Sequence, residues 1–126
     1  MFNILIVDDS ETIRAIIAKT LKMAEVPTGK VLEAANGREA LDILRREWID
    51  LVFADINMPV MNGVEMIEEM ANDGMLKSMP VVIVSTEGSR TRIEQLEAKG
   101  VRAYLRKPFT PEALKRVVDD ILGVQK

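Results

Sequence analysis

Three short runs of consecutive apolar residues stand out along the chain, at residues 4–7, 51–54 and 81–84. Each run is continuous rather than alternating, which is typical of strands covered on both faces in a parallel sheet. Two weaker runs, at residues 31–32 and 103–105, fit strands nearer the edges of the sheet. The pattern therefore predicts five strands.

The stretches between these runs carry apolar residues at helical spacing. The last stretch is the clearest, because Thr110 can cap a helix, Pro111 suits its first position and Gly123 can end it. Ser10 can cap the first helix in the same way. The apolar faces are marked by Ile13, Ile17 and Leu21, by Ala40, Leu41 and Leu44, by Ile67, Met70 and Ala71, by Ile93, Leu96 and Ala98, and by Leu114, Val117, Val118, Ile121 and Leu122.

A strand followed by a helix, repeated five times, predicts an α/β fold of the doubly wound class. Such alternation implies right-handed crossovers and a parallel sheet with helices on both faces. No linker, low-complexity tract or sequence repeat interrupts the pattern, so residues 1–126 are expected to form one domain. Ligands of such sheets bind beyond the carboxyl ends of the strands, where the strand order reverses.

Composition excludes several kinds of chemistry. The 126 residues are 48% hydrophobic and 29% charged with a net charge of −3, which is ordinary for a soluble globular protein and unlike a basic nucleic-acid binder. The chain has no Cys and no His, which excludes disulfides, thiolate or histidine metal sites and a Ser-His-Asp triad. No signal peptide or membrane-spanning run is visible, so a cytoplasmic protein is expected.

Polar side chains follow four of the five predicted strands. Together they bring three carboxylates, hydroxyls and one ammonium group to one edge of the sheet, a set that suits Mg2+ and a phosphoryl group. A carboxylate can attack an activated phosphoryl group and form an acyl phosphate. Each residue alone is as easily a turn former or a cap, but their combination is specific. They are Asp8 and Asp9, Asp55, Ser85 and Thr86, and Lys107 with Pro108.

At these residues the sequence resembles the response-regulator receiver family, in its single-domain CheY-like form. Two signatures are matched by residues 4–10, Ile-Leu-Ile-Val-Asp-Asp-Ser, and 55–63, Asp-Ile-Asn-Met-Pro-Val-Met-Asn-Gly. Residues 84–87, Val-Ser-Thr-Glu, and 107–109, Lys-Pro-Phe, match two more. The resemblance covers essentially the whole chain and implies a flavodoxin-like sheet of five strands in the order 2-1-3-4-5.

The resemblance implies a role for each site residue. Asp55 would be the phosphoacceptor, with a histidine kinase as the phosphodonor. Mg2+, or Mn2+ in its place, would be held by Asp55, by Asp9 directly, by Asp8 mainly through water, and by the backbone carbonyl of Asn57. The chain would catalyse its own phosphorylation and dephosphorylation without turning over a small-molecule substrate.

The remaining family positions concern the phosphoryl group and the switch. Lys107 and Ser85 would bind phosphoryl oxygens, and the bond before Pro108 is expected to be cis. Ser85 would also be the switch hydroxyl, whose movement towards the phosphoryl group empties space that the Tyr104 ring can enter. Asn57 and Glu87 would tune how fast water attacks the acyl phosphate, and an amide and an acid there predict a short-lived phosphoryl group.

Output is expected on the face formed by the fourth helix, the fifth strand and the fifth helix. Residues 88–126 hold nine basic and five acidic side chains, against a net charge of −7 for residues 1–87. A partner with an acidic, partly apolar segment is the sharper interpretation, and a mixed solvated surface is the plainer one. The candidate output residues are Arg90, Arg92, Ile93, Tyr104 and Arg106.

Two positions depart from the commoner family pattern. Ser85 stands where Thr is more frequent, which keeps the hydroxyl but loses a methyl group that restrains the side chain, so coupling to Tyr104 is expected to be looser. Arg106 is larger and more polar than the small apolar residue often found there, which leaves the identity of the output partner open.

Competing interpretations come from other classes. A Mg2+-dependent phosphohydrolase with an Asp nucleophile usually has a second Asp where Asn57 stands, and a cap domain that no insertion here can supply. A flavodoxin-like cofactor binder needs a phosphate-cradling loop where Asp8 and Asp9 would repel phosphate. A receiver cut from a larger regulator is a third possibility, although a free-standing monomer is favoured. The single-domain organisation and the set of Asn57, Glu87 and Tyr104 fit a role in chemotaxis, with a phosphorelay as the alternative.

Two further features carry no visible chemistry. Six of the eight Met residues lie between Met58 and Met79, and they are expected to fill gaps in the core around the third helix rather than to line a binding groove. Trp48 is expected to pack near the end of the second helix.

Overall fold

The computed structural model describes residues 1–86 and 90–123. Within them, five strands alternate with five helices, as the apolar pattern predicts. The elements are β1 (Phe2–Val7), α1 (Glu11–Met23), β2 (Thr28–Ala34), α2 (Gly37–Arg46), β3 (Leu51–Ala54), α3 (Gly63–Ala71), β4 (Val81–Ser85), α4 (Arg90–Ala98), β5 (Ala103–Arg106) and α5 (Pro111–Leu122).

The strands form one parallel sheet in the order β2-β1-β3-β4-β5, which confirms the expected fold. The three continuous apolar runs are the three central strands, because only a strand with neighbours on both sides and helices on both faces is apolar throughout. The edge strand β2 is longer than the run at 31–32 predicts. It includes Gly29, Lys30 and Glu33, which are exposed and interrupt the apolar run that would mark the strand in the sequence.

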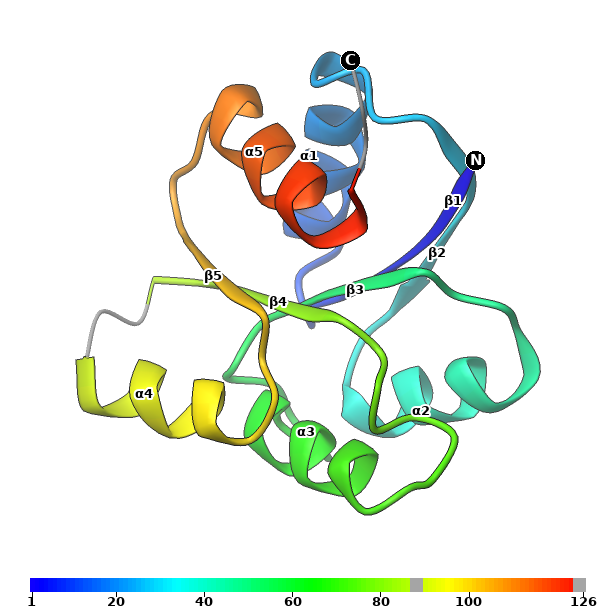
Figure 1. The fold of residues 1–126 in the computed structure, drawn as a ribbon, viewed down its shortest axis with the longest axis vertical. Coiled ribbons are helices and arrows are strands. Elements are labelled where there is room, and N and C mark those ends of the chain that lie inside the picture. Colours follow the sequence, from blue (N-terminus) through cyan, green and yellow to red (C-terminus); the bar gives the residue numbers. More distant parts are fainter. Residues whose placement is uncertain (87–89, 124–126) are drawn as a thin grey trace.

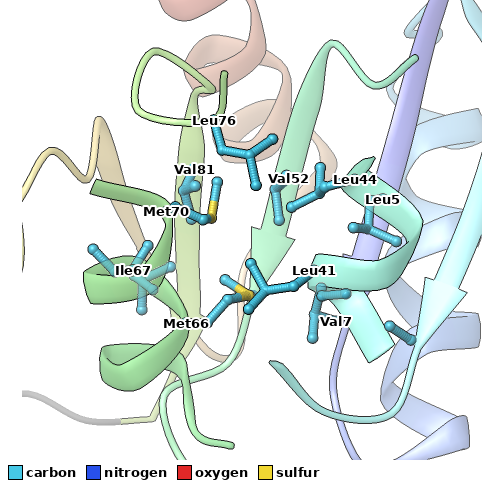
Figure 2. Close-up of a cluster of buried hydrophobic side chains, with 14 of the residues drawn as sticks. Leu5, Val7, Leu41, Leu44, Val52, Met66, Ile67, Met70, Leu76 and Val81 are labelled. Atoms are coloured by element: carbon cyan, nitrogen blue, oxygen red, sulfur yellow. The ribbon is translucent and has the colours of Figure 1, made fainter. Parts of the chain in front are cut away.

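Helices cover both faces of the sheet (Figure 1). α1 and α5 lie on one face, and α2, α3 and α4 lie on the other. Two buried clusters result. Ile4 and Ile6 of β1 point towards α1 and α5, whereas Leu5 and Val7 point towards α2 and α3. Figure 2 shows the second cluster, in which side chains of α2 and α3 meet those of β1, β3 and β4.

The helix ends follow the capping signals. Ser10 accepts a hydrogen bond from the Ile13 amide at 3.2 Å, and Thr110 accepts one from the Ala113 amide at 3.0 Å. Gly123 ends α5 in the left-handed region, with φ 66°. These ends fix where the loops at the carboxyl edge of the sheet begin.

Two large apolar residues are not where the sequence analysis put them. Met61, Met66 and Met70 are buried as expected, but Met75 is 90% exposed. Trp48, which was expected to pack, is 78% exposed. Both prediction errors have one physical reason: these residues lie in loops that follow α2 and α3, where the helical period no longer sets the direction of a side chain. In the part of the chain that the structure describes, no helix is long and apolar enough to cross a membrane.

Candidate functional site

The carboxyl end of β1 delivers two adjacent carboxylates. Asp8 is 2% exposed, and its Oδ1 accepts a hydrogen bond at 2.9 Å from the amide of Ser10, the residue that caps α1. Asp9 is exposed. The turn from β1 into α1 thus holds one acid in the protein interior and presents the other to solvent.

Asp55 follows β3, the strand that pairs with β1. Its amide donates to the carbonyl of Val7 at 3.0 Å, so the ladder between the two strands continues up to the site. Its Oδ1 accepts from the amide of Ile56 at 2.7 Å, and its side chain is 14% exposed. Asp55 is therefore fixed in orientation and accessible.

These three acids converge. One carboxylate oxygen from each of Asp8, Asp9 and Asp55 can be chosen so that all lie within 4.8 Å of one another. Nζ of Lys107 lies 3.2 Å from Oδ2 of Asp8 and 3.5 Å from Oδ2 of Asp55. Like charges at this spacing repel, and the single ammonium offsets only part of that repulsion. An all-oxygen set of this kind fits a hard divalent cation such as Mg2+.

The two strands on the other side of Asp55 supply the remaining polar groups. Ser85, at the end of β4, is 1% exposed, and its carbonyl accepts from the Lys107 amide at 3.0 Å and from the Tyr104 hydroxyl at 3.3 Å. The peptide bond between Lys107 and Pro108 is cis. Tyr104 is half-buried and packs against the cluster beneath α2, α3 and α4.

The other predicted site residues lie in the loop after β3, on α4 and β5, or outside the described chain. Asn57 is exposed in the loop after Asp55. Glu87 lies outside the described residues. On the expected output face, Arg90 and Arg106 are exposed, Ile93 is half-buried, and Arg92 lines a hollow between α3 and α4 together with residues such as Asn62 and Lys99.

Sequence reasoning missed Arg14, which cross-links the site to the edge of the sheet. Its Nη1 donates to the carbonyl of Asp8 at 2.6 Å, and its Nε pairs with Oε1 of Glu33 at 2.8 Å. The side chain of Arg14 is only 15% exposed. The guanidinium therefore fixes the backbone between the two carboxylates of β1. Arg14 lies one helical turn after Ser10, but nothing in the sequence alone links it to Glu33 on the next strand.

Sequence reasoning also gave no role to Gly63, the first residue of α3. A Cβ there would overlap the carbonyl oxygen of Asp55, so only glycine allows α3 to approach the end of β3 this closely. In the same loop, the Met61 amide donates to the carbonyl of Pro59 at 2.7 Å, and Val60 between them has φ 66°. This γ-turn puts a β-branched residue in the left-handed region, a strained conformation.

The fold and the site agree with comparisons to known proteins. The family model of the response regulator receiver domain matches residues 4–119. The chain therefore belongs to the response regulator receiver domain family, whose members act in two-component signalling.

Several chemotaxis proteins match this chain over nearly their full length. A chemotaxis protein CheY homolog of Campylobacter jejuni is 40% identical over 96% of this chain and 92% of its own. Chemotaxis protein CheY1 of Helicobacter pylori is 36% identical over 96% of this chain and 97% of its own. The structure of CheY4 from Vibrio cholerae superposes with a TM-score of 0.85 at 35% identity, covering 96% of this chain and 98% of that one. The chain is a CheY-like receiver.

Proposed function

We propose that this chain is a signalling switch that accepts a phosphoryl group on Asp55 from a histidine kinase. One observation carries the proposal: three carboxylates from β1 and β3 lie within reach of one cation, and Lys107 contacts two of them. Such a site can receive a phosphoryl group only if its negative charge is offset, and the ammonium and a bound divalent cation would do this together.

The transfer step needs only a nucleophile and charge stabilisation. A carboxylate oxygen of Asp55 attacks the phosphorus, and as the new P–O bond forms, the P–N bond to the donor imidazole breaks. The electron pair of the P–N bond stays on the imidazole nitrogen, which takes up a proton. The hydrogen bond from the Ile56 amide holds Oδ1 of Asp55 in place, which leaves Oδ2, on the side of Lys107, as the attacking atom.

Mg2+ is the cofactor that the site fits, with Mn2+ as a substitute of similar preference for oxygen ligands. Asp8, Asp9 and Asp55 would hold it through their carboxylates, and Asn57 through its backbone carbonyl. When bound, the cation supplies positive charge to the phosphoryl oxygens. Lys107 serves another oxygen of the same group, and its position between Asp8 and Asp55 already favours that contact.

The signal would leave the site through Ser85 and Tyr104. Ser85 binds a phosphoryl oxygen through its hydroxyl, and its side chain then leaves space that the Tyr104 ring can fill. The two residues already touch, through the hydrogen bond from the Tyr104 hydroxyl to the Ser85 carbonyl. An output partner that prefers the inward ring shifts the same equilibrium, so phosphorylation and partner binding strengthen each other.

The lifetime of the signal would be set by Asn57 and Glu87, two residues beyond Asp55 and Ser85 respectively. An amide and an acid flanking the acyl phosphate can orient an attacking water, so a short-lived phosphoryl group is expected. A Glu87→Ala variant should lose phosphoryl groups more slowly than the wild type. An unchanged decay rate, or a wild-type phosphoprotein lasting many hours in Mg2+, would count against this part of the proposal.

The output surface would be the exposed part of α4, β5 and α5. The excess of basic residues in positions 88–126 suits a partner with an acidic, partly apolar segment, docking near Arg90, Arg92, Ile93, Tyr104 and Arg106. Since relatives of 36–40% identity are chemotaxis proteins, chemotaxis is the proposed pathway, and a phosphorelay is the alternative. The switch would act as a cytoplasmic monomer of one domain, residues 1–126.

The test is phosphotransfer from candidate kinases. Labelled phosphoryl groups should move to the wild type in Mg2+, and should not move to Asp55→Asn or in the presence of a chelator. The beryllofluoride-activated chain is then used to capture the output partner. Affinity for that partner should fall on charge reversal at Arg90 and Arg92, and a partner peptide whose affinity ignores both this change and salt would contradict the proposed output face.

A further inference from the structure

A second surface with a defined hollow lies at the amino ends of the strands, opposite the proposed phosphorylation site. The loops that lead into β3 and β4 border a hollow of about 450 Å³ on the side of α2 and α3. Figure 1 shows these loops at the amino ends of the strands, away from the ends that carry the carboxylates. We call this the amino-edge surface; its residues used below are Arg46, Trp48, Met75, Leu76, Met79 and Pro80.

Trp48 forms one wall of the hollow, and hydrogen bonds hold it in place although it is 78% exposed. Its Nε1 donates to Oδ1 of Asp50 at 3.2 Å, and its carbonyl accepts from Nδ2 of Asn3 at 2.9 Å. The other carboxylate oxygen of Asp50 accepts from the Asn3 amide at 2.8 Å. An exposed indole fixed in this way loses little conformational entropy when a partner covers it.

The network around Asn3 extends to the neighbouring strand. Oδ1 of Asn3 accepts from the Lys30 amide at 2.9 Å, and a Cβ on Gly29 would lie only 2.6 Å from that oxygen. Glycine at position 29 therefore lets the side chain of Asn3 reach across β2. The amino ends of β1, β2 and β3 are fastened together beneath the indole, so the surface is rigid.

Met75 belongs to the loop on the other side of the hollow and is 90% exposed. Its amide donates to Oδ1 of Asp73 at 2.8 Å, and Asp73 pairs with Arg45 of α2 at 3.7 Å. Both apolar side chains are therefore attached to fixed backbone. Between them lie Leu76, Met79 and Pro80, which are buried or half-buried. Trp, Met and Arg are residues enriched in protein interfaces.

The charges around the hollow decide what kind of partner fits. Residues 1–87 have a net charge of −7, yet two of their eight basic residues, Arg45 and Arg46, line the hollow. Lys30 pairs with Glu47 of the lining, and Lys77 lies between Leu76 and Ser78, which also line it. Arg45 is paired with Asp73. Among the described residues, Arg46 and Lys77 make no ion pair, and both are exposed. The surface thus offers unneutralised positive charge beside exposed apolar groups.

We infer that the amino-edge surface is a docking site for a protein segment that carries one large apolar side chain flanked by carboxylates. The apolar side chain enters the hollow between Trp48 and Met75, and the carboxylates meet Arg46 and Lys77. Charge complementarity of this kind speeds association and excludes basic partners. The indole, once the partner covers it, and the arginine supply the central contacts, as in other interface hot spots.

This site would work independently of the phosphorylation switch. None of the residues at the amino edge contacts Asp8, Asp55 or Lys107 in any hydrogen bond or ion pair among the described residues. A ligand that binds both states of a switch equally does not shift the equilibrium between them. The inferred partner therefore tethers the chain whether or not Asp55 is phosphorylated, unlike a partner of the proposed output face.

The experiment uses the full chain to select binders from random short peptides displayed on phage. Peptides that also bind a Trp48→Ala Met75→Glu double variant are removed. Enriched peptides are synthesised and titrated while the emission of Trp48, the chain's sole tryptophan, is recorded. We expect Asp or Glu beside Leu, Phe or Met in these peptides, and a blue shift of the emission on binding. Affinity should agree within about twofold with and without beryllofluoride and Mg2+, as expected for a partner that binds both states of the switch equally.

Matched variants separate a role in binding from damage to the fold. Arg46→Glu should weaken binding by about tenfold, whereas Arg38→Glu, an exposed arginine at the other end of α2, should not change it. Met75→Glu should weaken binding as well, and it disturbs no packing because the residue is 90% exposed. Met75→Glu therefore keeps the test valid even if Trp48→Ala fails to fold.

Several results would overturn the inference. Enriched peptides without carboxylates would exclude an acidic partner, and peptides indifferent to Met75→Glu would place the binding elsewhere. Self-association in sedimentation that Met75→Glu abolishes would make a second copy of the chain the occupant. Co-sedimentation with anionic lipid vesicles that Trp48→Ala abolishes would make it a membrane surface.

Discussion

The surfaces at the two ends of the sheet differ in how readily they can be recognised from the sequence. At the carboxyl end, charged residues follow buried strands directly, and a charge after an apolar run has no role in the core. At the amino end, Trp48 and Met75 follow helices rich in apolar residues, and in the sequence they look like further core. The comparison teaches that polar sites are visible as exceptions to an apolar pattern, whereas apolar surfaces are hidden within it.

The largest expected effect concerns the charge at the carboxyl end. Mg2+ at about a hundred times its Kd should raise the free energy of unfolding of the wild type by about 2.7 kcal/mol, because only the folded chain brings the three acids together. Asp9→Asn should lose most of this gain, and Asp120→Asn, an exposed acid on α5, should keep it. Thermal unfolding with and without Mg2+ measures both. An equal Mg2+ effect in the two variants would argue against the metal site.

The next effect concerns the close approach of α3 to Asp55. Gly63→Ala should lower the free energy of unfolding by about 1–3 kcal/mol and slow phosphoryl acceptance, because the added Cβ overlaps the Asp55 carbonyl. Gly74→Ala is the matched control, since a Cβ there meets nothing within 4 Å. Urea unfolding compares the two variants. Equal stabilities would show that the loop after Asp55 can move at little cost.

A smaller effect of opposite sign is expected from backbone strain. Val60→Gly should raise the free energy of unfolding by about 0.5–1 kcal/mol, because glycine adopts φ 66° freely and the 80% exposed side chain loses little packing. Glu25→Gly, at φ 59° after α1, should gain less because Glu is not β-branched. A loss of stability in Val60→Gly would mean that the turn is not strained.

The smallest effect is expected at the amino end. Trp48→Ala and Met75→Glu should leave the rate of phosphotransfer to Asp55 within about twofold of the wild type, because the amino-edge surface is inferred to be independent of the switch. Phosphotransfer assays on each variant measure this. A change of tenfold or more would link the two ends of the sheet and remove the distinction between them.

Much of the fold could be predicted because the apolar pattern and the capping residues indicate the same elements. Continuous apolar runs identified the three central strands, and capping residues such as Ser10 and Thr110 marked helix starts. The edge strand β2 could not be bounded, since its exposed Lys30 and Glu33 give no apolar run. Strand order came from the family resemblance, because local patterns do not encode which strands become neighbours.

The site was predictable for residues whose chemistry is unusual at a strand end, namely Asp8, Asp9, Asp55 and Lys107. Arg14 and Gly63 were missed for different reasons. Arg14 acts through Glu33, nineteen positions away, and only the folded sheet brings them together. Gly63 acts through the absence of a side chain, and its need appears only when α3 packs against Asp55.

The central claim is that Asp55 receives the phosphoryl group. The most direct measurement is mass spectrometry of the chain after incubation with a phosphorylated histidine kinase in Mg2+. One phosphoryl group per chain should appear on the peptide that contains Asp55, and hydroxylamine should remove it, as expected for an acyl phosphate. The Asp55→Asn variant should stay unmodified. A phosphoryl group on a serine or threonine, or an equal yield in Asp55→Asn, would contradict the account.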